Sequence, residues 1–195
     1  IREYERTTTA IINGYVHPRV ADYLTKLQDA LKQSGVSAPP LITKSNGGVM
    51  SAEIGKTSCV NMVLSGTASG VIGGAFVART SGIKNAITLD IGGTSADVAV
   101  VIDGNPQYGM GEKIGEFPLY IPSVSVTSIG DGGGSIARAD EFGVLKVGPE
   151  SAGSDPGPAC YGRGGTRPTI TDAFAVSGFL GHHHLAYNSV ALDME

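Results

Sequence analysis

The segment 90–97 (Asp-Ile-Gly-Gly-Thr-Ser-Ala-Asp) contains the residue types that bind phosphate and magnesium. Carboxylates such as those of Asp90 and Asp97 are ligands that Mg²⁺ prefers, and the hydroxyls of Thr94 and Ser95 can donate hydrogen bonds to phosphate oxygens. The glycine pair between them offers backbone N–H groups that no side chain covers. The segment therefore predicts a phosphate and metal cradle, although the same residues also suit an ordinary tight turn.

Two apolar strands are expected to position this segment. Ile87 and Leu89 precede it, and the β-branched run at residues 98–102 follows it. The segment would then be the tip of a β-hairpin, which excludes a Rossmann fingerprint because that motif needs a helix after its glycines. The sequence Gly-Lys-Thr at residues 55–57 is not a P-loop, since Met50 stands where the first glycine is required.

A second glycine-rich loop, residues 129–135, could also bind an anion. Three consecutive glycines lose much conformational entropy on folding, so turn geometry alone does not explain them. The N–H groups of Gly132, Gly133 and Gly134 could face a phosphate or a nucleoside. If residues 135–139 form a helix, its N-terminus would add to this anion site. A flexible turn is the alternative.

The remaining pattern predicts helices that alternate with short strands. Helices are expected at residues 7–33, 64–78 and 171–177, and a strand at residues 41–43. Gly35 is placed to end the first helix, and Thr171 to cap the last one. Gly66, Gly70 and Gly74 recur every four residues in the second helix, which predicts a face open to close packing. The tract 130–168, rich in Gly and Pro, predicts loops, short strands and turns.

Composition limits the possible partners. The chain has 195 residues, of which 41% are hydrophobic and 16% charged, and a net charge of −4. These values describe a globular chain without the basic surface that nucleic acid requires. The uncharged segment 57–78 is too polar for a membrane span. The two cysteines, Cys59 and Cys160, are too few for a disulfide scaffold, so we expect inert buried thiols and a cytoplasmic location.

Blocks spread over nearly the whole chain resemble the family of hydantoinase A, 5-oxoprolinase and the acetone carboxylase β subunit. They occur in the family's order, at residues 45–50, 64–66, 90–97, 132–136, 147–153 and 158–162. Residues 2–6 resemble a stretch well inside these much longer proteins, so the chain is expected to be one internal fragment of a larger protein. Residues 1–84 would form connecting helices and a short strand, and residues 85–180 a phosphate-loop lobe with a glycine-rich insertion.

The resemblance implies an α/β fold, an actin-like ATPase (ribonuclease-H-like) lobe. It would have a mixed sheet, flanking helices and a Gly/Pro-rich loop region. Residues 90–94 would be the second of two phosphate loops, and the first would lie upstream of this sequence. The family usually has Thr before the second aspartate, where this chain has Ala96. That difference removes one possible hydroxyl donor. It puts in question the details of substrate or nucleotide binding, but not the assignment to the ATPase class.

The resemblance also implies the chemistry. ATP would phosphorylate the carbonyl oxygen of a cyclic amide, such as hydantoin or 5-oxoproline, and water would then attack the activated carbon. A second, B-type hydantoinase subunit is the expected partner, and the fragment alone is expected to be inactive. An ATP-dependent carboxylase and a non-enzymatic nucleotide switch of the actin or Hsp70 kind remain alternatives. A homo-oligomer is compatible with the sequence.

Residue roles follow from the matched positions. Asp90 is the expected catalytic residue, and would hold Mg²⁺ through water or orient the attacking group. Asp97 is a second metal contact or, preferably, a cap of the hairpin. The residues expected to bind ATP are Gly92, Gly93, Thr94, Ser95, Asp97, Gly132, Gly133 and Gly134.

Overall fold

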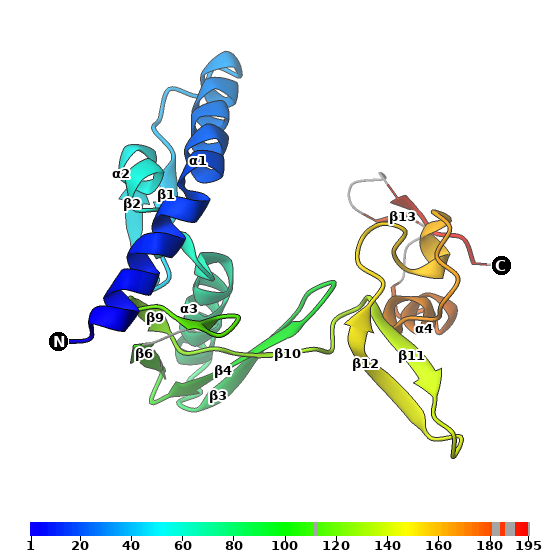
Figure 1. The fold of residues 1–195 in the computed structure, drawn as a ribbon. Helices are drawn as coiled ribbons and strands as arrows, with labels where there is room; N and C mark the ends of the chain where they lie inside the picture. The colour runs from blue at the N-terminus through cyan, green and yellow to red at the C-terminus, as the bar shows by residue number, and fades with distance from the viewer. Residues whose placement is uncertain (111–112, 181–183, 186–189, 195) are drawn as a thin grey trace. The chain divides into compact units, whose positions relative to one another are not determined.

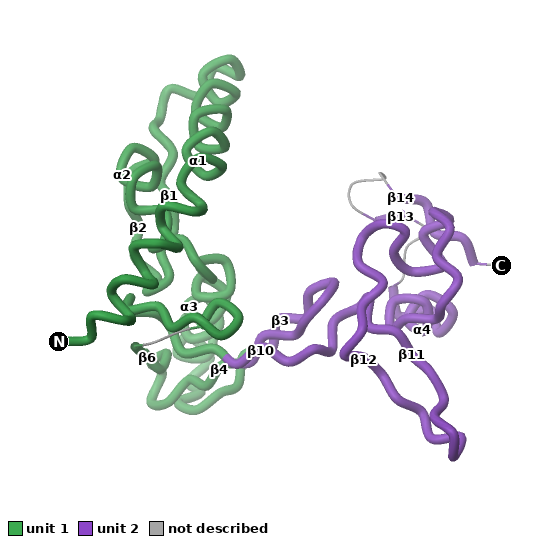
Figure 2. The backbone as a smooth tube through the Cα atoms, in the orientation of Figure 1, with its two compact units in different colours: residues 1–88, 99–126 green, residues 89–98, 127–195 purple. Residues whose placement is uncertain are grey.

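The computed structural model describes most of the chain. The described residues are 1–110, 113–180, 184–185 and 190–194 (Figure 1). They form two compact units (Figure 2). Unit 1 comprises residues 1–88 and 99–126, and unit 2 comprises residues 89–98 and 127–195. The chain passes from one unit to the other within the hairpin around residues 89–98.

Unit 1 begins with the long helix α1 (Glu3–Gln33), drawn in blue in Figure 1. Its apolar periodicity buries Leu24 completely. Gly35 ends the helix as predicted: its φ of 78° reverses the chain, and the N–H of Val36 donates to the carbonyl of Leu31 at 2.9 Å. That bond satisfies one of the carbonyls which the helix leaves unpaired.

Short elements complete unit 1. They are β1 (Leu41–Thr43), β2 (Val49–Ser51), α2 (Ala52–Thr57), η1 (Cys59–Met62), α3 (Ser65–Thr80), β5 (Asn105–Pro106), β6 (Tyr108–Met110), β7 (Lys113–Ile114), β8 (Phe117–Pro118) and β9 (Pro122–Val124). Gly74 of α3 packs closely, since a Cβ there would lie 2.5 Å from Cγ2 of Thr88. Among the described atoms, none lies within 4 Å of a Cβ at Gly66 or Gly70. The predicted close-packing face therefore exists at only one of the three glycines.

The hairpin predicted around residues 90–97 is present. Strands β3 (Ala86–Ile91) and β4 (Ala96–Ile102) are neighbours in a four-stranded sheet with β10 (Thr127–Ile129) and β5. Strand β10 pairs antiparallel with β4, and Ser128 stands opposite Asp97. The hairpin tip belongs to unit 2, where the glycine-rich loop also lies.

Unit 2 corrects two expectations. Residues 135–139 form a strand, β11 (Ser135–Ala139), because they pair antiparallel with β12 (Leu145–Ser151); the helix considered for them is wrong. Helix α4 (Ile170–Val176) is capped by Thr169 rather than Thr171. The remaining elements are η2 (Ala159–Tyr161), β13 (His184–Leu185) and β14 (Val190–Ala191).

Both cysteine side chains are buried, and burial affects the pKa of their thiols. Cys59 and Cys160 are free and buried, and burial raises the pKa of both, that of Cys160 to about 12. A raised pKa leaves less thiolate at neutral pH, which is what an inert buried thiol requires. Among the residues that the structure describes, no helix is both long and apolar enough to cross a membrane.

Candidate functional site

The tip of the β3–β4 hairpin presents its main chain to solvent. Asp90 near the end of β3 is exposed, as are Gly92, Gly93 and Thr94, whereas Ser95 is half-buried. The N–H of Gly92 donates to the carbonyl of Ser95 at 2.9 Å and closes the turn. The predicted cradle residues therefore share one tight, accessible turn.

The carbonyl groups of this turn point into the protein. The carbonyl oxygen of Gly92 accepts from the N–H of Gly133 at 2.9 Å, and that of Gly93 accepts from the N–H of Gly134 at 2.6 Å. Because N–H and C=O lie on opposite sides of a trans peptide, the N–H groups of Gly93 and Thr94 point the other way. Within the described part of the chain, neither of these two N–H groups has a hydrogen-bond acceptor. The tip thus offers two main-chain donors to a ligand.

The glycine-rich loop contacts the hairpin through its main chain. The N–H groups of Gly133 and Gly134 are engaged with the hairpin carbonyls. A Cβ on Gly132 would lie 2.5 to 2.6 Å from backbone atoms of Thr94 and Ser95. Only glycine permits this approach, so the loop supports the hairpin directly, and binding of ATP by residues 132–134 stays a prediction.

The loop is in turn fixed from its other side. The N–H and the Oγ1 of Thr171 both donate to the carbonyl oxygen of Gly133, each at 2.8 Å. The N–H of Ala152, just after β12, donates to the carbonyl oxygen of Gly134, also at 2.8 Å. The loop is therefore hydrogen-bonded on both sides, between the hairpin and the start of α4.

The start of α4 is itself a hydrogen-bonded unit. Asp172 accepts from the N–H and Oγ1 of Thr169, and from the N–H of Cys160, each at 2.8 Å. Burial raises the pKa of Asp172, but these hydrogen bonds to its charged form outweigh burial and hold the pKa below its usual value. The carboxylate that supports α4 is thus ionised at neutral pH.

The sequence matches the hydantoinase/oxoprolinase family over residues 6–195. The chain belongs to this family. It is 38% identical to the caprolactamase α subunit of Pseudomonas jessenii over 100% of the chain and 28% of that protein. It is 40% identical to the acetophenone carboxylase γ subunit of Aromatoleum aromaticum, over 92% of the chain and 25% of that protein. The resemblance expected from the sequence is confirmed.

A solved structure supports the fold of this family member. The nucleotide-free structure of acetone carboxylase, an enzyme of ATP-dependent acetone carboxylation, matches with a TM-score of 0.82 at 31% identity. The match covers 100% of this chain and 27% of that one. The predicted class, an α/β lobe of actin-like ATPase type, is confirmed. The chain spans about a quarter of the length of these relatives.

Asp97 lies on β4 of this hydantoinase/oxoprolinase family chain, after the hairpin turn. It is half-buried on β4, and the hydroxyl of Ser128 on β10 donates to its Oδ1. This contact joins two strands of the sheet and suits the structural alternative for Asp97. Among the described residues, no group of three or more His, Cys, Asp or Glu side chains could hold a metal ion. A metal at the tip would therefore take most of its oxygen ligands from water and from a bound phosphate.

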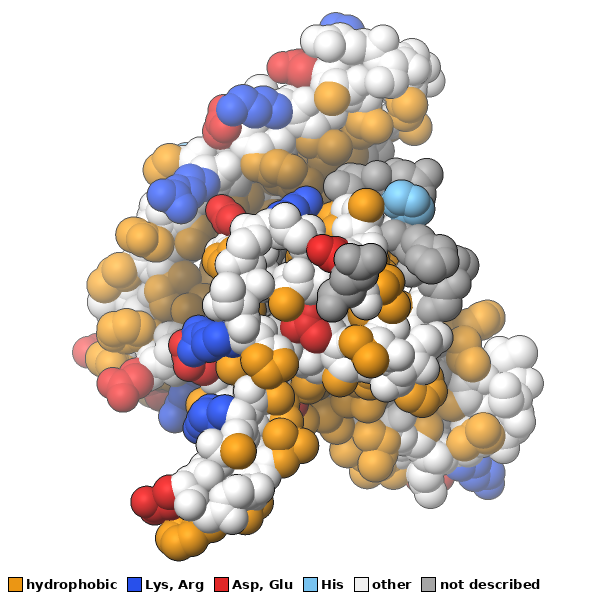
Figure 3. Space-filling view, turned by 90° about the vertical axis from the view of Figure 1, so that its right-hand side faces the viewer, with side chains coloured by type: hydrophobic (Ala, Val, Ile, Leu, Met, Phe, Trp, Pro, Cys, Tyr) orange, Lys and Arg blue, Asp and Glu red, His pale blue; other side chains and the backbone are white. Residues whose placement is uncertain are grey.

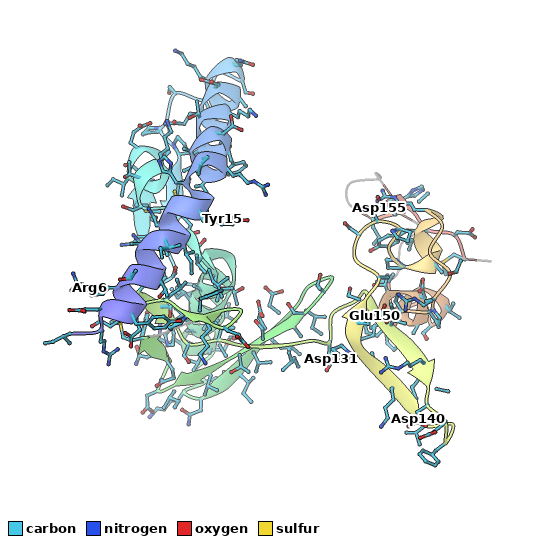
Figure 4. The ribbon with its side chains drawn as sticks, viewed as in Figure 1. Arg6, Tyr15, Asp131, Asp140, Glu150 and Asp155 are labelled. Carbon is cyan, nitrogen blue, oxygen red and sulfur yellow. The ribbon has the colours of Figure 1, made fainter. Side chains whose placement is uncertain are left out.

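Sequence reasoning missed two residues beside the tip. Asp131 is exposed in the glycine-rich loop, directly before the glycine that packs on Thr94 (Figure 4). Thr171 was expected to cap α4, and no spacing in the sequence connects it with Gly133. Basic side chains do not gather into a broad patch on the face drawn in Figure 3, as far as its described residues show.

Proposed function

We propose that this chain is the phosphate-binding part of an ATP-dependent enzyme that hydrolyses a cyclic amide of the hydantoin or 5-oxoproline type. One observation carries the proposal: the N–H groups of Gly93 and Thr94 at the hairpin tip have no acceptor among the described residues, and they follow the exposed Asp90 in the same segment. Membership of the hydantoinase/oxoprolinase family supports the reaction class. The caprolactamase relative is named for a cyclic amide.

The tip fits a phosphate group bound with Mg²⁺. The two N–H groups would hold phosphate oxygens, and the hydroxyls of Thr94 and Ser95 would add donors. Asp90 would hold the metal through water and keep it beside the phosphates. Apart from Gly93 and its two chain neighbours, no atom of the described residues lies within 4 Å of a Cβ built on Gly93, so a phosphate group has room there.

The reaction explains why a nucleotide is needed. Amide resonance makes the carbonyl carbon a poor electrophile, and transfer of the γ-phosphoryl group to the carbonyl oxygen converts that oxygen into a good leaving group. The hairpin donors would stabilise charge on the transferred group, and Asp90 would keep it aligned. Water then attacks the carbon to give a tetrahedral adduct, and the C–N bond breaks, which frees the amine and leaves an acyl phosphate. A second water cleaves the acyl phosphate into a carboxylate and inorganic phosphate.

A carboxylase is the second candidate. The acetophenone carboxylase γ subunit and the structure titled for acetone carboxylation both align over nearly the whole chain. The same phosphate-binding tip would serve that chemistry, because activation of bicarbonate or a ketone enol also uses ATP. A nucleotide switch without turnover is the third, non-enzymatic candidate.

The full protein is proposed to act with a second subunit of B type. Both relatives reported above are named as subunits. The two free buried thiols suit a reducing, cytoplasmic setting.

Phosphate release by the full-length protein with its partner subunit tests these alternatives. The proposal predicts turnover stimulated by hydantoin, 5-oxoproline or caprolactam. Stimulation only by acetone or acetophenone with bicarbonate would favour the carboxylase. Nucleotide binding without stimulation by either group would favour the switch.

A further inference from the structure

We propose that Thr171 is a positioning residue for the phosphate-binding tip, acting through the peptide group that joins Gly133 and Gly134. This inference rests on the proposed function, since it concerns how the tip is held for ATP. It starts from one contact: the hydroxyl and the N–H of Thr171 both donate to the carbonyl oxygen of Gly133 at 2.8 Å.

One peptide group connects Thr171 with the hairpin. The carbonyl of Gly133 and the N–H of Gly134 belong to the same peptide group, and that N–H donates to the carbonyl of Gly93 at 2.6 Å. The carbonyl of Gly93 shares its own peptide group with the N–H of Thr94. Hydrogen bonds in such a chain polarise one another, so donation by Thr171 strengthens the N–H of Thr94 as a donor.

Close packing makes the connection stiff. A Cβ on Gly133 would lie 2.7 Å from Oγ1 of Thr171, and a Cβ on Gly134 would lie 2.8 Å from the carbonyl oxygen of Gly93. The loop fills the space between the hairpin and the start of α4, so a shift of α4 would also displace the hairpin. Thr171 itself is held by α4, whose first turn is fixed by the pair Thr169 and Asp172.

The hydroxyl of Thr171 is not needed to satisfy the carbonyl of Gly133. The N–H of Thr171 already donates to that oxygen, and would still do so after the hydroxyl is removed. Loss of the hydroxyl therefore leaves no buried group unpaired. We expect its effect on the orientation of the hairpin, and so on binding of ATP, rather than on folding.

The test compares three variants of the full-length protein with its partner subunit. Thr171→Val removes the hydroxyl and keeps the shape of the side chain, whereas Thr171→Ser keeps the hydroxyl. Thr25→Val is the matched control, because its hydroxyl donates to the carbonyl of Ala21 on the exposed surface of α1. In Thr171→Val, the KM for MgATP is expected to rise about fivefold, the effect of one ordinary hydrogen bond.

The KM for the amide substrate is expected to stay constant, and Thr171→Ser is expected to restore most of the wild-type value for MgATP. A wild-type KM for MgATP in Thr171→Val would overturn the inference. The inference would also be overturned if Thr171→Val and Thr171→Ser raised the KM for MgATP equally. It would be overturned too if Thr171→Val changed the KM for MgATP and the KM for the amide substrate by the same factor.

Hydrogen exchange without nucleotide separates this inference from the proposed function. In Thr171→Val, the amides of Gly133 and Gly134 should exchange about fivefold faster than in wild type. Unchanged exchange would overturn the positioning contact even in an active enzyme. A wild-type protein that never hydrolyses ATP would overturn the proposed function, while the exchange result would still decide the contact.

Discussion

The hairpin tip and the glycine-rich loop contain similar residues and use them in opposite ways. Residues 90–95 and 131–135 each combine an aspartate, adjacent glycines and a hydroxyl residue. In the hairpin, the carbonyls point inward and the N–H groups of Gly93 and Thr94 point outward. In the loop, the N–H groups of Gly133 and Gly134 donate to the carbonyls of Gly92 and Gly93. One segment offers donors to a ligand, and the other holds that segment in place.

The hairpin and the loop need glycine for two different reasons. At Gly93 the missing side chain leaves the main chain accessible, since none of the described atoms lies within 4 Å of a Cβ there. At Gly132 a Cβ would meet backbone at 2.5 Å, so glycine is required for packing. Glycine count alone therefore does not identify a phosphate site. Substitutions can separate the two roles by measuring function and stability together.

The largest effect is expected at Asp90. Asp90→Asn removes the charge proposed to hold Mg²⁺ beside the phosphates, so ATP turnover of the full protein should fall at least about 100-fold. The side chain is exposed, so the melting temperature should change little. Steady-state phosphate release and thermal unfolding measure the two quantities.

Asp29→Asn is the matched control, because Asp29 is another exposed carboxylate, on α1. It should leave turnover unchanged. Turnover of Asp90→Asn at the wild-type rate would contradict the role of Asp90.

Gly132→Ala and Gly93→Ala test the comparison directly. Gly132→Ala should lower the free energy of unfolding by about 1–3 kcal/mol, because its Cβ overlaps the backbone of the hairpin. Gly93→Ala should leave that free energy nearly unchanged and raise the KM for ATP about tenfold or more, since the methyl group enters the space proposed for phosphate. Urea unfolding and ATP kinetics provide the readouts.

If both alanine variants lost the same free energy of unfolding, glycine would not have different roles at positions 93 and 132. A wild-type KM for ATP in Gly93→Ala would show that the hairpin tip does not contact the nucleotide.

A smaller effect is expected where α4 supports the loop. Asp172→Asn weakens the hydrogen bonds to Thr169 and Cys160, and should destabilise the protein by about 1–2 kcal/mol at pH 7. The folded-state pKa of Asp172 is lowered, so its stabilisation is complete above the unfolded value of about 3.9. It is lost as the pH falls through the lower folded pKa.

Unfolding of wild type and Asp172→Asn across pH 2 to 7 measures this contribution. The gap between the two proteins should be constant from pH 7 to about pH 5 and should close below pH 4. A gap that widens in acid would show that the carboxylate is not stabilised by these bonds.

Local patterns predicted the elements that depend on near neighbours. Apolar periodicity and Gly35 located α1 and its end, and alternation around residues 90–97 located the hairpin. Residues 135–139 are different, because their strand depends on pairing with residues 145–151 in β12, and local propensity does not encode that partner.

The site was predictable as a location, while its internal bonding was not. Residue types identified the turn at 92–95, since glycine and hydroxyl residues at a hairpin tip suggest main-chain donors. The sequence does not say whether the N–H groups of Gly133 and Gly134 face solvent or a neighbouring carbonyl, because both arrangements need glycine. The contact of Thr171 with Gly133 joins residues 38 positions apart, and only the fold brings them together.

Hydrogen exchange of the full-length protein, with and without MgATP, tests most directly whether the hairpin tip binds phosphate. We expect MgATP to slow exchange of the amides at residues 93–94, which have no acceptor among the described residues, and to leave those at residues 133–134 nearly unchanged, because they are already hydrogen-bonded. Unchanged exchange at residues 93–94 under saturating MgATP would contradict the account.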